Sequence, residues 1–354
     1  MIDLEKIKHL TYVDVTLWLM RTVIILLLIA GTVGTVIKDR YLTEQWVNMV
    51  VFGMTMGGIY ALVALGYTMV YGILRLINFA HGDIFMTGAY TAYFVAGPLG
   101  KSGFLDENLF IGMAAILLTA MFVCSAMALL VERICYRPFR HVRTLAPLIC
   151  AIGASFVLQH SFRGMYGSTV RAYPDVTLFE AHVVIFGFSF LFIQLLVIAA
   201  AMASMYSLYL IVHKTKMGTA MRAVSEDRDA AALMGIDVNK VIIFTFILGG
   251  SMAGIGGVLY AFVFKQVHFF MGFFPGIKAF SAAVLGGIGN VPGAMLGGFF
   301  LGVVESLGPA LFLDGLGIVA PYQLRELIAF TMLVMVLIFR PQGILGERLA
   351  RARA

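Results

Sequence analysis

Long apolar runs occupy most of this 354-residue chain and constrain what it can fold into. Only 12% of the residues are charged, about half of the ~25% that is typical of soluble domains. No soluble core could hide so much apolar surface, so we expect lipid to surround most of the chain. A helix that crosses a bilayer needs roughly 17–25 apolar residues. The apolar runs lie near residues 17–37, 47–70, 84–97, 109–131, 145–163, 184–212, 241–264, 276–289, 293–308 and 322–340.

These runs predict an all-α fold, a polytopic transmembrane helix bundle with about 8–10 membrane segments, including short or re-entrant helices. The neighbouring runs 276–289 and 293–308 are short and could form either two crossings or a re-entrant pair. The run 184–212 is too long for a straight span, so we expect its first residues to lie outside the bilayer. No clear cleavage site follows the run 17–37, which favours a retained helix over a cleaved leader.

Basic charge is distributed unevenly among the loops between these runs. If the N-terminus is cytoplasmic, the cytoplasmic segments contain 16 Lys and Arg residues and the opposite loops contain 5. Because cytoplasmic loops are enriched in Lys and Arg, this pattern places both termini in the cytoplasm. The net charge of +6 then reflects these loops rather than a nucleic-acid partner. The segments assigned to the cytoplasm are 1–16, 71–83, 132–144, 213–240 and 340–354.

Glycines recur at a spacing of four residues in several runs. Each pair removes side-chain bulk from one helix face and lets a neighbouring helix approach closely. We therefore expect a tightly packed bundle, and we interpret these glycines as packing residues. The pairs are Gly53 with Gly57, Gly250 with Gly254, Gly293 with Gly297, and Gly298 with Gly302.

The loop 213–240 is polar, but its composition favours a helix over a flexible linker. Ser225 can cap a short helix that has Glu226 and Asp227 in its first turn. Gly235 then supplies a residue that ends the helix. The apolar side chains of such a helix have no lipid to face, so we expect the loop to dock in a groove on a partner protein.

A cluster of polar residues precedes the run 84–97. His81 and Asp83 flank the predicted start of this helix, and helix capping by Asp83 is the simpler interpretation of the carboxylate. Irregular backbone at membrane depth is tolerated where it lines a cavity, so contact with a transported substrate is the alternative. Asn78 belongs to the same cluster, and Tyr71 lies seven residues before it and could share its helix face. We take these four residues as candidates for the substrate pathway.

Glu305 is the clearest carboxylate inside an apolar run, and we add it to the pathway candidates. An ionisable group at membrane depth is a functional hypothesis by default. However, Glu305 lies near the outer end of its run and could reach the interface. Arg325 and Glu326 open the last run and are expected at the interface. A secondary transporter driven by an ion gradient would need a buried ionisable pair, and Glu305 alone gives little support for one.

The sequence shows no pattern that provides enzyme chemistry. Gly100, Lys101 and Ser102 resemble the end of a phosphate-binding loop, but Val95 stands where that loop needs its first glycine. The three cysteines are too few and too scattered for a metal site. No nucleophile, base and orienting group occur together. We expect no catalytic residues, no metal and no cofactor on this chain, so any ATP must bind to another chain.

Several segments resemble the permeases of binding-protein-dependent ABC importers. Asp229, Ala230 and Ala231, followed after three residues by Gly235, match the spacing of the EAA---G coupling motif, with Asp in place of Glu. The longer motif ends in I-x-L-P, whereas this chain reads TFIL without the proline. Four segments are similar to branched-chain amino acid permeases of the LivH type: 57–90 (GGIYALVALGYTMVYGILRLINFAHGDIFMTGAY), 217–237, 283–298 (AVLGGIGNVPGAMLGG) and 339–346 (FRPQGILG).

The resemblance covers about residues 46–347 and implies a domain organisation. Residues 1–45 look like an N-terminal extension with one extra transmembrane helix. Residues 46–347 would form the permease transmembrane domain, with a cytoplasmic coupling loop at 213–240, and residues 348–354 a basic cytoplasmic tail.

The resemblance also implies a function, partners and a location. The chain would be a permease subunit that translocates branched-chain amino acids across the bacterial inner membrane. It would form a heterodimer with a second related permease and work with two cytoplasmic ATPase subunits, which bind the ATP, and a periplasmic substrate-binding protein. In that family the coupling loop docks in a groove of the ATPase, a role that would belong here to Asp229, Ala230, Ala231 and Gly235.

Three other functions remain open at this stage. A permease for urea or short amides shares the same architecture, and an uptake assay would separate it. An ion-coupled secondary transporter would work without an ATPase. A membrane-embedded enzyme would need a converging catalytic set that the sequence does not display.

Overall fold

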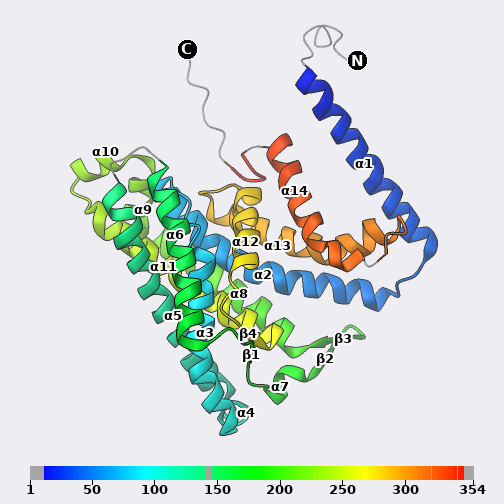
Figure 1. The fold of residues 1–354 in the computed structure, drawn as a ribbon, viewed down its shortest axis with the longest axis horizontal. Coiled ribbons are helices and arrows are strands. Elements are labelled where there is room, and N and C mark those ends of the chain that lie inside the picture. Colours follow the sequence, from blue (N-terminus) through cyan, green and yellow to red (C-terminus); the bar gives the residue numbers. More distant parts are fainter. Residues whose placement is uncertain (1–11, 141–144, 320, 341, 347–354) are drawn as a thin grey trace.

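Seven helices in the described part of the chain are long and apolar enough to cross a membrane, and Phe273–Gly286 is a shorter apolar helix. The computed structural model describes residues 12–140, 145–319, 321–340 and 342–346. Most of its long helices pack together, α1 stands apart from them, and the short strands gather toward one end of the bundle (Figure 1). The predicted all-α polytopic bundle is therefore confirmed. The predicted tail 348–354 lies outside the described residues.

The predicted apolar runs correspond to separate helices. The first half of the chain forms α1 (Tyr12–Lys38), α2 (Thr43–Leu74), α3 (His81–Lys101), α4 (Phe104–Glu107), α5 (Leu109–Val131), η2 (Glu132–Tyr136), η3 (Arg137–Phe139) and α6 (Ala146–Tyr166). The second half forms α7 (Thr177–Glu180), α8 (Phe192–Lys214), α9 (Lys216–Glu226), α10 (Arg228–Leu233), α11 (Val238–Phe264), α12 (Phe273–Gly286), α13 (Val291–Gly308), η4 (Pro309–Asp314), η5 (Pro321–Leu324) and α14 (Arg325–Phe339).

A small region with strands covers the end of the bundle opposite α10. Strand β1 (Arg171–Ala172) pairs with β4 (Gln266–Val267), and β2 (His182–Ile185) pairs with β3 (Phe188–Leu191), both antiparallel. The β2–β3 turn has positive φ at Phe186 and Gly187, which is the backbone that a tight two-residue hairpin needs. Helix α8 begins only after this hairpin, at Phe192, so the first residues of the run 184–212 are not part of the long apolar helix, as expected of residues outside the bilayer.

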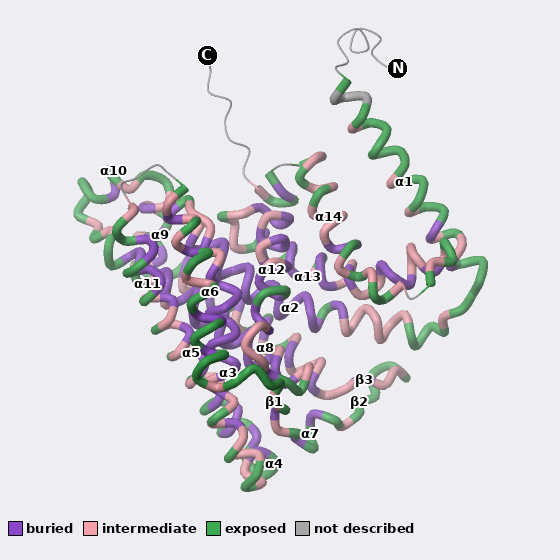
Figure 2. Tube along the Cα trace, viewed as in Figure 1, coloured by how far each residue is buried: buried purple, intermediate pink, exposed green. Residues whose placement is uncertain are grey.

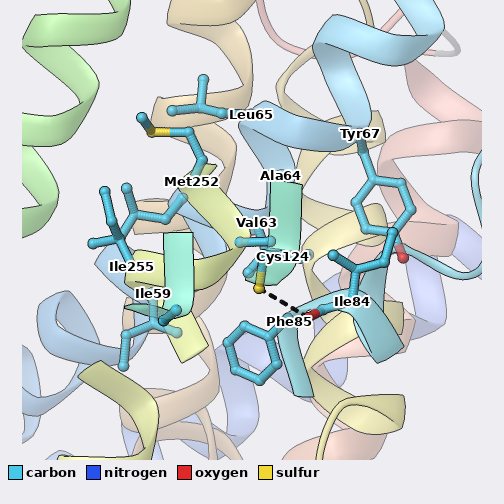
Figure 3. Close-up of a cluster of buried hydrophobic side chains, with 14 of the residues drawn as sticks. Ile59, Val63, Ala64, Leu65, Tyr67, Ile84, Phe85, Cys124, Met252 and Ile255 are labelled. Atoms are coloured by element: carbon cyan, nitrogen blue, oxygen red, sulfur yellow. Dashed lines mark hydrogen bonds between the residues drawn. The ribbon is translucent and has the colours of Figure 1, made fainter. Parts of the chain in front are cut away.

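The core of the bundle is built around α2 and α11. Buried residues follow both helices and the adjoining part of α3, whereas the outer faces of α1, α5 and α6 are exposed (Figure 2). Side chains from four helices interdigitate there (Figure 3). The Cys124 thiol of α5 donates a hydrogen bond to the Ile84 carbonyl of α3 at 3.0 Å. The exposed apolar faces are the ones that a lipid environment requires.

Glycines let the central helices touch through their backbones, as their spacing predicted. A Cβ built on Gly57 of α2 would lie 2.7 Å from Phe299 Cα of α13. A Cβ on Gly254 of α11 would lie 2.7 Å from the Ala120 carbonyl oxygen of α5. Both distances are shorter than real side chains tolerate, so these helices pack at a separation that only glycine permits.

Helix α1, the predicted extra span, lies at the edge of the bundle (Figure 1). It packs against η4, where Thr35 Oγ1 donates to the Ala310 carbonyl at 3.0 Å and Lys38 Nζ donates to the Asp314 carbonyl at 2.9 Å. Most of its apolar side chains are exposed. Its attachment to the rest of the chain is therefore local.

The glycine contact predicts a difference between two Gly→Ala substitutions. Gly57→Ala should lower the free energy of unfolding by about 1–3 kcal/mol, because the new methyl group overlaps the α13 backbone. Gly153 of α6 has no neighbouring atom within 4 Å of its would-be Cβ. Gly153→Ala should therefore be neutral or stabilising, by up to about 1 kcal/mol. Thermal denaturation of the detergent-solubilised protein measures both, and equal stabilities would contradict the packing.

Candidate functional site

The loop 213–240 folds into α9 and α10 at one end of the bundle, as the sequence predicted (Figure 1). The predicted cap is wrong: Ser225 lies in the last turn of α9, and Asp227 caps α10 instead. The Asp227 carboxylate accepts hydrogen bonds from the backbone N–H groups of Asp229 at 2.9 Å and Ala230 at 3.0 Å. Gly235 ends the segment with φ +84°, so its predicted helix-ending role is confirmed.

Arginines anchor this segment to the core helix α2. Arg228 at the start of α10 donates from Nε to the Ile73 carbonyl at 3.0 Å. Arg75, which follows α2, donates from Nη2 to the Ser225 carbonyl at 3.2 Å. Burial, together with the positive charges of Arg140 and Arg75, lowers the pKa of the Arg228 guanidinium, which stays charged because arginine titrates so high. These hydrogen bonds tie α10 and the end of α9 to the end of α2.

The outer surface of α10 carries two large apolar side chains at its C-terminal end. Leu233 is 89% exposed and Met234 is 83% exposed, and neither has lipid to face in a solvated loop. Of the predicted coupling residues, Asp229, Ala230 and Gly235 are exposed, whereas Ala231 packs inward. From the sequence alone, the apolar side chains of this helix were expected to dock on a partner protein. The structure shows that Leu233 and Met234 are the large apolar side chains left exposed there.

The polar cluster at the start of α3 is buried. Helix α3 begins at His81, and no side chain caps it, so the predicted capping of the helix by Asp83 is wrong. The Asp83 carboxylate instead accepts hydrogen bonds from α6, from Gln159 Nε2 at 2.8 Å and from Ser155 Oγ. The carboxylate therefore ties α3 to α6, because a buried acid needs such donors.

Asn78 and His81 lie in the same buried region. Asn78 Oδ1 accepts a hydrogen bond from the Ala80 N–H at 3.2 Å. The His81 ring packs edge-on against Tyr67, with ring centroids 4.9 Å apart. Among the described residues, Asn78 Nδ2 and His81 Nε2 have no hydrogen-bond partner. Tyr71 is half-buried on α2, and its backbone carbonyl accepts a hydrogen bond from the N–H of Arg75 at 2.8 Å.

Glu305 belongs to a different site, a buried charge cluster. It is 6% exposed, so it is buried within the protein rather than open to its surroundings. Lys278 of α12, itself 4% exposed, donates from Nζ to Glu305 Oε1 and to Glu326 Oε1, both at 2.7 Å. Arg325 Nε lies 3.8 Å from each of these oxygens. Arg325 and Glu326 were expected at the membrane interface. Both side chains are partly exposed, but they also belong to this charge cluster. Such pairing is what permits charges at this depth.

Lys278 was missed in the sequence. It stands within the run 276–289, whose apolar neighbours concealed it. A single lysine inside an apolar run was itself the signal, because such a charge at membrane depth needs a partner. The partner residues are 27 and 48 positions away along the chain, which sequence spacing does not reveal.

The charge cluster forms one wall of a cavity of about 560 Å³. The other walls come from the first turns of α2 and α8 and the last turns of α11 and α13, at the ends farthest from α10. None of Tyr71, Asn78, His81 and Asp83 lines it. The lining residues are Gln45, Asn48, Met49, Phe52, Met56, Tyr60, Gln194, Tyr260, Phe264, Phe274, Pro275, Lys278, Gly302, Glu305, Ser306, Tyr322, Arg325 and Glu326.

These features define a class of protein. The described helices form a multi-pass membrane protein with a charged cavity toward one end and an exposed helical segment at the other. No group of His, Cys, Asp and Glu within the described ranges could hold a metal ion. A solute-sized cavity among membrane helices is the arrangement of a transport protein.

Comparison with known proteins gives the family. Residues 49–337 match the family described as branched-chain amino acid transport system / permease component. The chain is 40% identical over 309 residues to the BraD high-affinity branched-chain amino acid permease of Pseudomonas aeruginosa, covering 86% of this chain and 96% of BraD. It is 38% identical over 312 residues to LivH of Escherichia coli K12, covering 87% and 96%. The chain therefore belongs to this permease family, as the sequence motifs indicated.

A more distant relative has a related name. The chain is 26% identical over 297 residues to a protein of Methanocaldococcus jannaschii described as a probable branched-chain amino acid transport permease, LivM. The match covers 78% of this chain and 79% of that protein.

The buried pair predicts non-additive mutant stabilities. Lys278→Met alone should lower the free energy of unfolding by about 3–5 kcal/mol, because it leaves the Glu305 carboxylate buried without its cation. Lys278→Met combined with Glu305→Met should recover most of this loss, since both charges are then removed. Thermal denaturation of the single and double variants measures the coupling. Additive losses would show that the two side chains do not interact as described.

Proposed function

We propose that this chain is the permease subunit of an ATP-driven importer that carries branched-chain amino acids across the bacterial inner membrane. The observation that carries the proposal is the family match over residues 49–337, supported by close similarity to BraD and LivH. The cavity fits this role, because its walls combine charged side chains with aromatic and methionine side chains. A branched-chain amino acid has both kinds of surface.

The α9–α10 segment is the proposed docking site for the ATPase. An exposed apolar tip at Leu233 and Met234 matches the way a short helix inserts into a groove on a partner. Asp229 and Ala230 lie on the exposed side with them, Ala231 seats the helix on this chain, and Gly235 sets its exit angle. In this assignment ATP binds to the ATPase subunits, and this chain needs no cofactor.

Coupling can follow from the anchoring of α10. Closure of two ATPase subunits would displace α10, which connects directly to α8 through α9 and to α11 through Gly235. The Arg228 hydrogen bond to Ile73 would pass the displacement to α2. Since α2, α8 and α11 all line the cavity at their other ends, their movement would change its access.

The other partners are proposed from the relatives. Similarity to LivM supports a second related permease, because a chain of similar sequence can pair in a heterodimer. A periplasmic binding protein would deliver the amino acid to the side of the β2–β3 hairpin. The chain would lie with both termini in the cytoplasm, supported by its bias in basic residues.

One observation favours a second candidate function. The buried Lys278–Glu305 pair is the feature that an ion-coupled transporter would need and that the sequence alone did not reveal. Reconstitution separates the two candidates and tests the substrate. The assembled complex in proteoliposomes should take up leucine only when ATP is present, and it should not take up urea. A protonophore should leave the rate of leucine uptake unchanged. Uptake that continues without ATP and collapses with the protonophore would establish the ion-coupled mechanism.

The docking assignment predicts the effect of a charge on α10. Leu233→Asp should abolish ATP-dependent leucine uptake and release the ATPase, because a carboxylate replaces the exposed apolar side chain of the docking surface. The variant should still insert and fold, since the Leu233 side chain is 89% exposed and contributes little to the packing of the described residues. Lys240→Ala, at an exposed residue beyond α10, is the matched control and should retain at least half of the uptake. Normal uptake by Leu233→Asp would contradict the assignment.

The orientation predicts which cysteines an impermeant reagent reaches. Phe186→Cys, at the fully exposed tip of the β2–β3 hairpin, should react with an impermeant maleimide in intact spheroplasts. Leu233→Cys should react only after the membrane is opened. Both variants are read by mass shift of the purified chain. The reverse pattern would invert the proposed topology.

A further inference from the structure

The charged wall of the cavity balances two cations against two carboxylates, but not all of its polar atoms have partners within the described ranges. Lys278 Nζ contacts Glu305 Oε1, Glu326 Oε1 and the Tyr60 hydroxyl, the last at 3.5 Å. These three contacts use all three N–H donors of the ammonium group. Lys278 therefore has no donor left for a ligand and holds the two carboxylates in place.

Each of the two glutamate carboxylates has an oxygen that accepts no hydrogen bond from the part of the chain that the structure describes. Among the described residues, Glu305 Oε2 and Glu326 Oε2 are buried and have no hydrogen-bond partner. A buried carboxylate oxygen without a donor is unfavourable and needs an explanation, and a bound group that donates to it is one. Both glutamates line the cavity, so their unpaired oxygens suit a group with several N–H donors and a positive charge.

Arg325 offers the opposite chemistry on the same wall. Its Nε lies 3.8 Å from each paired carboxylate, beyond hydrogen-bonding distance, and its side chain is 46% exposed. A guanidinium has five N–H donors arranged to bind a carboxylate through two parallel hydrogen bonds. The cluster can therefore receive an anion and a cation side by side.

Apolar side chains also line the cavity, beside uncharged polar residues such as Asn48 and Gln194. They include Phe52 and Met56 of α2, Phe264 of α11 and Phe274 of α12. A volume of about 560 Å³ lies within the usual range for small-molecule sites. The flexible methionine and the aromatic rings can pack against branched aliphatic side chains of differing shape.

We propose that this cavity binds the zwitterion of a free apolar amino acid. The α-ammonium group donates to the free oxygens of Glu305 and Glu326, the Arg325 guanidinium binds the α-carboxylate, and the aliphatic side chain packs on the aromatic wall. Lys278 acts as the positioning residue. This assignment rests on the proposed function and adds to it a site within the permease that selects the backbone of the substrate. It lies at the end of the bundle opposite α10, where substrate would arrive.

A cysteine at the cavity wall reports binding even when it is weak. Asn48 lines the cavity and is half-buried, with its side chain outside the charge cluster. The Asn48→Cys complex is placed in nanodiscs without binding protein and labelled with a small water-soluble thiol reagent, and mass spectrometry follows labelling at residue 48. Leucine should slow this labelling. Leucinamide, which lacks the carboxylate, and 4-methylpentanoate, which lacks the ammonium group, should each need at least tenfold higher concentration.

Two variants that each remove one charge test which side chain binds the carboxylate and which binds the ammonium group of leucine. Arg325→Gln should abolish the preference for leucine over leucinamide and keep the preference over 4-methylpentanoate. Glu305→Gln should do the reverse. A merely structural role would remove both preferences together, and that result overturns the assignment. If either variant fails to assemble, the analogue comparison in Asn48→Cys decides, and equal protection by leucine and both analogues overturns it.

The outcomes also separate this inference from the proposed function. Leucine uptake by the same complex without any protection of residue 48 would overturn the site while leaving the transport function intact. Absence of leucine uptake would overturn the function itself. Nanodiscs with and without phosphatidylethanolamine, whose headgroup is also zwitterionic, give the last control. Protection that depends on this lipid and not on leucine would make the cavity a lipid headgroup site and overturn the proposal.

Discussion

Backbone contact through glycine holds the centre of this bundle together. In a lipid environment apolar side chains gain little by leaving solvent, so association depends on close packing of the helices. Gly57 of α2 meets Phe299 of α13, and Gly254 of α11 meets Ala120 of α5. Helix α2 also packs on α8 and α12. The cavity walls and the anchored α10 are both attached to this central group, which allows one end of the bundle to respond to the other.

The buried charges give the cavity its character. Lys278 and Glu305 are each more than nine-tenths buried, and isolated charges at that depth would be very costly. Their pairing, extended by Glu326 and Arg325, joins α12, α13 and α14 at one wall. Aromatic and methionine side chains line the other walls. A cavity with these two surfaces accommodates a solute that carries both charge and an aliphatic group, which is the character of a branched-chain amino acid.

The sequence predicted the helices far better than the contacts between them. Apolar runs, glycine spacing and Gly235 all follow from local chemistry, and the structure bears them out. The family also followed from local motifs such as Asp229-Ala230-Ala231 and Gly235. The roles of single polar residues did not follow, because they depend on partners that are distant in sequence. Asp83 was expected to cap α3 but binds α6, and Lys278 was overlooked because its carboxylates lie on other helices.

The composition of the native complex tests the central claim most directly. The chain, tagged at one end, would be extracted from native membranes in mild detergent, and native mass spectrometry would weigh the intact assembly. This account predicts one copy of the chain with a second, related permease and two ATPase chains. A chain that is purified alone, or only with copies of itself, would contradict the ATP-driven importer. It would favour instead transport coupled to ions at Lys278 and Glu305.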